Sequence, residues 1–327
     1  MFCKVRPSVD ISRNGGILAE EMGLGKTIEV LSCILCHRYS RDREDRDAKG
    51  QSFRDTGCEL TENTKAADLL DAPSDCSLNC LCSEDDLHQE TAELVQCVHC
   101  GTFQHRTCVA WTDSDCQRYC CPNCCVLHPG SLMCKTTLIL CPASILNQWN
   151  EEIQKHIRPG ALSFYIYEGV RTVGYVQPKT LSEYDVVLCS YETLRQEALH
   201  LSLIDERRLR KRKRFTSTPT PLTTLYWWRI CVDEAQMLGN ASCRVAAMCQ
   251  ALSASYFWCI TGTPMQKAVV DLYPLFAFLR VPLLNHQRFW HKLLYEPYMC
   301  GCTAPLLDVT GRIMRRVAKA DLLDQVC

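Results

Sequence analysis

The sequence predicts an α/β protein in which a parallel β-sheet covered by helices carries a small, metal-bound domain as an insertion. Three observations support this prediction. A short apolar run at 16–19 precedes a glycine-rich turn and a helical pattern, and from residue 135 onward short apolar runs alternate with helical patterns. Such alternation is typical of a parallel sheet. Between these two regions, closely paired cysteines run from residue 80 to 124, a spacing typical of metal ligands.

The composition is that of a globular protein. The chain has 327 residues, 47% hydrophobic and 22% charged, which is enough for one large domain or two ordinary ones. Because its net charge is −1, any binding to nucleic acid depends on a local basic patch. No apolar run is long enough to span a membrane, and the first residues lack the apolar core of a signal peptide. We therefore expect the 25 cysteines to lie in a reducing compartment, where clustered cysteines are read as metal ligands before disulfides.

The glycine-rich turn after the first apolar run predicts a phosphate-binding loop. Gly23 and Gly25 let backbone N–H groups approach phosphate oxygens, and the start of the next helix adds partial positive charge. Lys26 is expected to reach the β- and γ-phosphates of a nucleotide, and Thr27 to hold Mg²⁺. The strict pattern has a glycine where Glu20 stands, so a plain glycine-rich turn is the alternative. The Lys-Thr pair and the flanking strand and helix favour the phosphate loop.

The cysteine-rich segment at 76–126, here called the zinc-finger segment, predicts two zinc sites. Thiol and imidazole ligands in four closely spaced pairs suit two tetrahedral zinc ions. Because the segment has few apolar residues, metal binding would contribute its folding free energy outright. The expected ligands are Cys80, Cys82, Cys97, Cys100, His105, Cys108, Cys121 and Cys124.

Other interpretations of these cysteines stay open. One is a set of free thiols. Another is a different choice of ligands, because Cys76, Cys116, Cys120 and Cys125 are spare. The last pair could begin at Cys120, although the Cys-Pro-x-Cys turn, a frequent zinc-binding turn, favours Cys121.

The remaining elements follow from apolar patterns along the chain. A charged segment with few apolar residues at 40–75 predicts a linker. Beyond the zinc-finger segment, the expected strands are 135–141, 162–167, 185–189, 228–232 and 256–260. Helices are expected at 143–156, at 190–199, after the Thr-Gly-Thr-Pro turn and, with an amphipathic pattern, at 312–326.

A dense basic run lies in the predicted loop 205–224. Seven of the eight residues at 207–214 are lysine or arginine. Such a run contacts a nucleic-acid backbone or acts as a nuclear-localisation signal. A solvated charged loop is an equally good interpretation.

A pair of carboxylates follows the predicted strand at 228–232. Side chains at the carboxyl end of a central strand lie where parallel sheets place their chemistry. Beside a phosphate loop, Asp233 would hold Mg²⁺ directly or through water, and Glu234 would polarise the attacking water as general base. Without a phosphate loop, such a pair is usually an ordinary surface feature. Thr261 and Thr263 are expected to place hydroxyls near the same edge.

These motifs, in this order, resemble the first RecA-like lobe of a superfamily-two helicase of the Swi/Snf type, a P-loop NTPase fold. EEMGLGKT is similar to that branch's DEMGLGKT, in which the position of Glu20 is not glycine. DEAQ is similar to the DEAH box, with Gln236 in place of histidine, and ITGTPMQK is similar to the motif that couples nucleotide state to DNA. The resemblance implies a catalytic role for Lys26, Asp233 and Glu234, and ATP with Mg²⁺ bound by Gly23, Leu24, Gly25, Lys26, Thr27, Asp233 and Gln236.

The resemblance also implies DNA as a partner. TTLILCPASILNQWNEE is similar to a helicase motif that touches the DNA backbone. DNA would then lie across residues near 142–144 and 190–192, with the basic run at 207–214 as a further contact.

The zinc-finger segment resembles a PHD finger in its order of four cysteines, one histidine and three cysteines. A RING usually places its histidine nearer the middle. The resemblance pairs Cys80, Cys82, His105 and Cys108 on one zinc and Cys97, Cys100, Cys121 and Cys124 on the other. PHD fingers often bind histone tails, and Phe103 and Trp111 are available for an aromatic cage, with a role in the small core as the alternative.

Taken together, the motifs resemble the SNF-histone-linker-PHD-RING helicase (SHPRH) group. The implied domains are the start of the lobe at 1–39, the linker at 40–75, the finger at 76–126 and the rest of the lobe at 134–327. The resemblance implies a nuclear, DNA-dependent ATPase in DNA-damage tolerance. A ubiquitin-conjugating enzyme would be a partner only if a RING lies beyond this chain.

We also expect the sequence to be a fragment, a short gene model or an isoform, because neither a second lobe nor a RING is recognisable after 261–264. The family's arginine fingers lie in the second lobe, so ATP turnover by this chain alone is expected to be weak or absent. The alternative functions are a histone-tail reader on a catalytically idle lobe and a fragment of a RING ubiquitin ligase.

Overall fold

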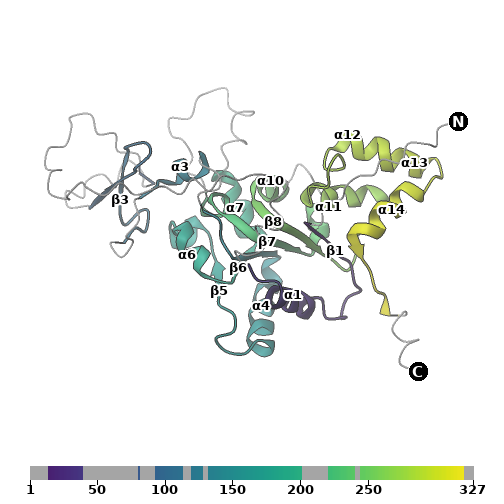
Figure 1. Ribbon diagram of the computed structural model, residues 1–327, viewed down its shortest axis with the longest axis horizontal. Coiled ribbons are helices and arrows are strands. Elements are labelled where there is room, and N and C mark those ends of the chain that lie inside the picture. Colours follow the sequence, from purple (N-terminus) through teal and green to yellow (C-terminus); the bar gives the residue numbers. More distant parts are fainter. Residues whose placement is uncertain are drawn as a thin grey trace. The chain divides into compact units, whose positions relative to one another are not determined.

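The computed structural model describes residues 14–39, 80–81, 93–112, 119–127, 132–200, 220–239 and 244–319 (Figure 1). The chain forms two units, one of Met1–Cys36 with Pro122–Cys327 and the other of His37–Cys121. The predicted linker and the basic run lie outside the described residues, as do Cys76, Cys82 and Cys116. Among the described residues, no helix is both long and apolar enough to cross a bilayer.

The first unit contains a seven-stranded sheet with the strand order β5-β6-β4-β7-β8-β1-β9. Every neighbouring pair of strands is parallel. This sheet confirms the predicted α/β fold class. The strands are β1 (Gly15–Leu18), β4 (Thr137–Cys141), β5 (Phe164–Tyr167), β6 (Val186–Ser190), β7 (Tyr226–Asp233), β8 (Ser253–Ile260) and β9 (Met314–Arg315).

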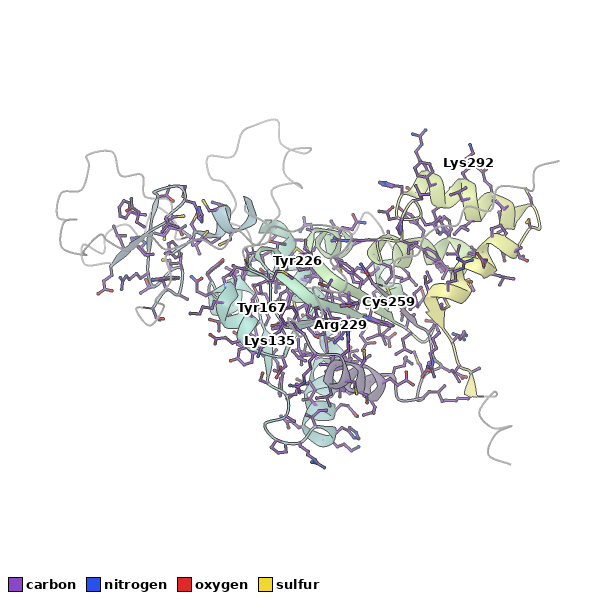
Figure 2. All side chains as sticks on the ribbon, viewed as in Figure 1. Lys135, Tyr167, Tyr226, Arg229, Cys259 and Lys292 are labelled. Carbon is purple, nitrogen blue, oxygen red and sulfur yellow. The ribbon has the colours of Figure 1, made fainter. Side chains whose placement is uncertain are left out.

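Both faces of this sheet are buried, because successive strand residues point into two separate apolar layers. Ile17, Leu138 and Leu140 lie in one layer, whereas their neighbours Leu18 and Ile139 lie in the other. In Figure 2, the labelled Tyr167, Arg229 and Cys259 lie among the packed side chains, and each is at most 1% exposed.

Helices cover the two faces (Figure 1). The helices α1 (Lys26–Cys36) and α4 (Ala143–His156) pack on one layer, and α7 (Tyr191–Glu197), α10 (Arg244–Ala251) and α11 (Tyr273–Phe278) pack on the other. The helix α4 has the bounds predicted from its apolar stripe, and its Trp149 and Ile153 are buried. The remaining elements of this unit are α3 (Pro122–Leu127), α5 (Val170–Val173), α6 (Pro178–Glu183), η3 (Ala198–His200), α9 (Pro221–Thr224), η4 (Ala235–Leu238), η5 (Val269–Leu272), α12 (Gln287–Trp290), η6 (His291–Tyr295), α13 (Glu296–Met299) and α14 (Ala304–Ile313).

The predicted amphipathic helix at 312–326 is wrong at residues 314–318, whereas Arg312 and Ile313 end α14 and Lys319 is again helical. The helix α14 ends at Ile313, and β9 then pairs with the outer edge of β1. At the end of β9, the Ala19 N–H donates to the Arg315 carbonyl at 2.8 Å, and beyond the strand the Glu21 N–H donates to the Val317 carbonyl at 3.1 Å. An open sheet edge offers unpaired backbone N–H and C=O groups. Hydrogen bonds to these groups of β1 stabilise the extended conformation more than the amphipathic pattern stabilises a helix. Residues 320–327 lie outside the described residues.

The second unit contains a short antiparallel hairpin of β2 (Leu94–Gln96) and β3 (Phe103–His105). Tyr119, which is 3% exposed, donates a hydrogen bond from its hydroxyl to the buried Gln104. The ring of Trp111 packs edge-on against Tyr119, with 5.0 Å between ring centroids. These few side chains form the small apolar centre of this unit.

Candidate functional site

The strand register brings the sequence motifs of the first unit to one edge of the sheet. Leu18 of β1 and Asp233 of β7 both align with Ile260 of β8. Because the strands are parallel, the loops that follow them leave from the same side. The phosphate loop, the Asp-Glu pair and the Thr261 turn therefore lie together, at what we call the motif edge.

The backbone of the predicted phosphate loop is left-handed at both glycines. Gly23 has φ of 88° and Gly25 has φ of 91°, a region that strains any residue with a Cβ. Lys26 begins α1, and its Nζ donates to the carbonyl oxygens of Glu20 at 2.9 Å and Glu21 at 3.2 Å. The ammonium group thus lies over the loop, within reach of anything that the loop binds.

The position of Glu20, where the strict pattern has glycine, is buried. Its side chain is 3% exposed, and its Oε1 lies 3.5 Å from Nε of Arg315. Burial raises the pKa of the neighbouring Glu29, and its hydrogen bond with Glu20 raises that pKa further. Glu20 is therefore part of the packing beneath the loop.

Asp233 is held by donors on both carboxylate oxygens. The Trp149 indole N–H donates to Oδ2 at 2.9 Å, and the Glu234 backbone N–H donates to Oδ1 at 2.9 Å. Burial raises the pKa of Asp233, while these two bonds and the charge of Lys26 act in the opposite direction. Its neighbour Glu234 has φ of 49°, a strained left-handed conformation of the kind that clusters at functional sites.

A chain of hydrogen bonds joins Glu234 to the Thr261 turn. Gln236 Nε2 donates to Glu234 Oε2 at 2.6 Å, Thr261 Oγ1 donates to Gln236 Oε1 at 2.6 Å, and the Thr263 N–H donates to Thr261 Oγ1 at 3.1 Å. An ionised carboxylate only accepts hydrogen bonds. This fixes the orientation of the glutamine amide and hence the direction of the whole relay.

Two further motif-edge contacts link separate loops. Arg316 Nη1 donates to the carbonyl oxygen of Ala19 at 3.0 Å and to that of Gly262 at 3.4 Å. The Ala143 N–H, at the start of α4, donates to Glu192 Oε2 at 3.1 Å. These contacts join the phosphate loop to the Thr261 turn, and the loop after β4 to the loop after β6.

Asp271 fixes the loop that follows the Thr261 turn. Its Oδ2 accepts from the backbone N–H groups of Gln266 at 3.0 Å, Lys267 at 2.7 Å and Ala268 at 3.1 Å. The bonds from Lys267 and Ala268 are the main reason that the pKa of Asp271 is lowered. The carboxylate form is therefore the one that orders this loop.

Replacing Asp271 with asparagine is expected to speed hydrogen exchange at the amides of residues 266–268, measured at pH 7. Because the folded-state pKa is lowered, protection by the carboxylate is complete above the ordinary aspartate pKa. It is lost as the pH falls through the lowered value, so the variant-to-wild-type ratio of exchange rates approaches one there. Asp308→Asn, which alters an exposed ion pair with Arg312, is the control and should leave these amides unchanged.

The cysteines of the zinc-finger segment are brought together as two groups. Ligand atoms lie within 4.8 Å of one another in each group. One group is Cys97, Cys100, Cys121 and Cys124, and the other is Cys80, His105 and Cys108. The fourth predicted ligand of the second group, Cys82, lies outside the described residues.

The surroundings of these sulfur atoms suit thiolates bound to a metal. The Cys121 N–H donates to Cys97 Sγ at 3.3 Å, and the His105 N–H donates to Cys80 Sγ at 3.3 Å. Such outer donors orient and stabilise first-shell ligands, and a set of thiolates with one imidazole suits zinc. Cys121 belongs to the first group, whereas the spare Cys120 lies beside it with its Sγ 3.7 Å from the Cys121 carbonyl oxygen.

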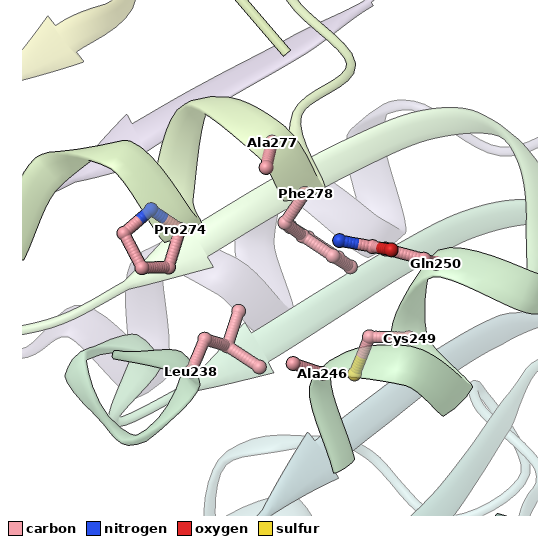
Figure 3. Close-up of a pocket in the computed structure, with 7 residues that line it drawn as sticks. All are labelled: Leu238, Ala246, Cys249, Gln250, Pro274, Ala277 and Phe278. Atoms are coloured by element: carbon pink, nitrogen blue, oxygen red, sulfur yellow. The ribbon is translucent and has the colours of Figure 1, made fainter. Parts of the chain in front are cut away.

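A small apolar pocket lies on the first unit between α10, α11 and η4 (Figure 3). Its volume is about 10 Å³, room for roughly one water molecule. Leu238, Ala246, Cys249 and Phe278 are among its lining residues. Its size and apolar lining exclude it as a nucleotide site.

A family model described as the SNF2-related domain matches residues 7–327. The chain belongs to the SNF2-related family. The match confirms the family resemblance that the motifs indicate. E3 ubiquitin-protein ligase SHPRH of Mus musculus is 35% identical over 88% of this chain, and that of Homo sapiens is 38% identical over 77%. DNA repair protein RAD5A of Arabidopsis thaliana is 29% identical over 90% of the chain.

This SNF2-related chain spans only part of its relatives, covering 17% of the mouse protein and 15% of the human one. Among solved structures, the SWI2/SNF2 ATPase core of Sulfolobus solfataricus in complex with dsDNA matches 95% of this chain and 42% of that one. The TM-score is 0.50 at 20% sequence identity, so this likeness concerns the fold alone.

The sequence does not predict two side-chain contacts that hold Asp233. Its apolar pattern places Trp149 only in the buried stripe of its helix, although the indole N–H donates to Asp233 Oδ2. Tyr191 lies within the predicted DNA contact at 190–192, but its hydroxyl donates to the backbone carbonyl of Asp233. Both carry a polar group on an otherwise buried ring, and a buried indole or phenol usually finds a partner. The sequence therefore indicates that each of these rings has a hydrogen-bond partner, but it does not indicate that the partner is Asp233.

Proposed function

We propose that this chain binds ATP with Mg²⁺ at the motif edge and hydrolyses it, and that DNA binding is coupled to this reaction. The observation that carries the proposal is the strand register, which gathers the Lys26 loop and the Asp233–Glu234 pair at one edge. The SNF2-related family match and the preformed left-handed loop support the nucleotide.

The roles of the residues follow from charge and position. Lys26 and the loop amides of Gly23 to Thr27 would bind the phosphates, and the Lys26 ammonium would leave the carbonyls that it contacts now. Thr27 and Asp233 would hold Mg²⁺, which would offset the charge that develops on the phosphates. Glu234 would accept a proton from the attacking water. Gln236 would transmit the state of Glu234 to the Thr261 turn.

The first test is binding of a fluorescent ATP analogue to the 327-residue chain, with Mg²⁺ and with EDTA. Binding that Mg²⁺ strengthens and that unlabelled ATP displaces supports the proposal. No displaceable binding would overturn it. Single-turnover assays with protein in excess then measure hydrolysis even when it is slow, and they test the expectation that the chain alone turns over weakly.

Replacing Glu234 with glutamine is expected to slow single-turnover hydrolysis by about a hundredfold or more, the typical contribution of a general base. Affinity for the ATP analogue should change little, because the amide keeps the size of the side chain and the Glu234 backbone N–H still donates to Asp233. Glu183→Gln is the matched control, because Glu183 is exposed at the end of α6 and precedes β6, at the opposite end of the sheet from the motif edge. Hydrolysis at the wild-type rate in Glu234→Gln would contradict the assigned role.

DNA is the proposed macromolecular partner. The Sulfolobus solfataricus protein was solved with dsDNA, and the relatives include a DNA repair protein. We place the contact at residues 142–144 and 190–192, with the basic run as a further contact. Fluorescence anisotropy of labelled duplex DNA measures binding by the full chain and by a variant that lacks residues 207–214. Comparing the two tests the basic run separately from the proposed contacts at the motif edge.

A second candidate function is histone-tail reading by the zinc-finger segment. It rests on the resemblance of the segment to a PHD finger, and the two groups of potential zinc ligands agree with that resemblance. Titration of the zinc-loaded chain with histone-tail peptides tests it, and no binding to any tail would overturn it.

A nuclear location is part of the proposal that the chain binds DNA and histone tails. The names of the SHPRH relatives also suggest that the chain is part of a RING ubiquitin ligase that recruits a ubiquitin-conjugating enzyme. Sequencing of the full transcript tests that suggestion.

A further inference from the structure

We infer that Trp149 is a positioning residue for Asp233, and that it ties the location of helix α4 to the Mg²⁺ ligand of the motif edge. This inference rests on the proposed function, because Asp233 is a Mg²⁺ ligand only if the chain binds Mg²⁺ with ATP. Its own basis is the direct bond from the Trp149 indole N–H to Asp233 Oδ2, at 2.9 Å.

The geometry makes this bond specific. Trp149 is 2% exposed and packs in the apolar layer between α4 and the sheet, so its ring cannot turn away to water. A carboxylate at the end of a strand can rotate about its χ angles, and the indole, together with the Glu234 N–H on Oδ1, holds it in one orientation.

A second donor supports the same arrangement. The Tyr191 hydroxyl, on α7, donates to the backbone carbonyl of Asp233. Asp233 is therefore held from two sides, by the helix that follows β4 and by the helix that follows β6. A displacement of α4 would move the carboxylate with it, because packed interiors transmit strain.

The test compares Trp149→Phe with wild type in the full chain. The variant keeps a buried aromatic ring and removes only the N–H donor and part of the ring area. The readout is the ratio of the dissociation constants of a fluorescent ATP analogue with EDTA and with Mg²⁺. A hydrogen bond to a charged group typically changes an equilibrium constant about tenfold or more, so we expect the ratio to fall about tenfold while affinity in EDTA stays unchanged.

Trp258→Phe is the matched control, because Trp258 packs on the same apolar layer from β8, and it should keep the wild-type ratio. In an Asp233→Ala background, Trp149→Phe should have no further effect, as expected for residues that act through one another. The inference is overturned if Trp149→Phe leaves the ratio of dissociation constants unchanged. It is also overturned if Trp149→Phe lowers that ratio as much in the Asp233→Ala background as in wild type. A wild-type ratio near one would instead overturn the proposed Mg²⁺ site.

Discussion

Replacing Lys26 with alanine is expected to reduce affinity for an ATP analogue by about a hundredfold or more. The Lys26 ammonium lies over the phosphate loop and donates to two of its carbonyl oxygens, at 2.9 and 3.2 Å. Phosphate oxygens would replace these carbonyls as acceptors. Each hydrogen bond to a charged group is worth about 1.5–3 kcal/mol, so losing two corresponds to roughly a hundredfold or more in affinity. Fluorescence anisotropy of the labelled analogue measures it.

Lys135→Ala provides the matched control. Lys135 is exposed and precedes β4, so it lies at the amino end of the sheet, away from the motif edge (Figure 2). Both variants remove one lysine charge, but only Lys26→Ala removes the ammonium group from the phosphate loop. Equal losses in the two variants would point to a general charge effect, and near wild-type affinity in Lys26→Ala would refute the phosphate-loop assignment.

Replacing Cys121 with serine is expected to release one of two zinc ions and to unfold the zinc-finger segment. Cys121 is 3% exposed, and its Sγ lies with those of three other cysteines. Metal binding supplies about 10–16 kcal/mol to the folding of zinc-finger peptides, far more than the few apolar contacts around Tyr119. Metal analysis of the purified chain counts the ions, and protease digestion reports on the fold of the segment.

Cys120→Ser is the control, since Cys120 adjoins Cys121 but belongs to neither ligand group of the described residues. It should keep both ions and the wild-type digestion pattern. The reverse result, zinc loss in Cys120→Ser alone, would show that the ligand pair begins one residue earlier. Chelation of both ions in wild type should reproduce the Cys121→Ser digestion pattern in the finger.

Much of the fold could be predicted from the sequence, because strands buried on both faces appear as short apolar runs. The runs at 135–141 and 185–189 became β4 and β6 with their ends moved by one or two residues. The ends of these runs then located the motif edge, since chemistry in parallel sheets follows the strands. The partition of cysteines into ligand groups needed the family resemblance, and the division of the chain into domains stays a prediction.

What could not be predicted depends on contacts between residues far apart in the sequence. The strand β9 pairs with β1 across almost the whole chain, and the amphipathic pattern of its surroundings indicates a helix. The bond from Trp149 to Asp233 likewise joins residues 84 positions apart. Sequence patterns report local periodicity and burial. They do not report which buried donor meets which acceptor.

The glutamine of the DEAQ motif has one further consequence. Gln236 donates to Glu234 on one side and accepts from Thr261 on the other. A histidine in that place would gain a second ring proton near neutral pH, since its ordinary pKa is about 6.5. It would then donate in both directions and break the relay toward Thr261. An amide has no such proton to gain, so in this chain Gln236 remains a donor to Glu234 and an acceptor for Thr261 in the pH range in which a histidine would titrate.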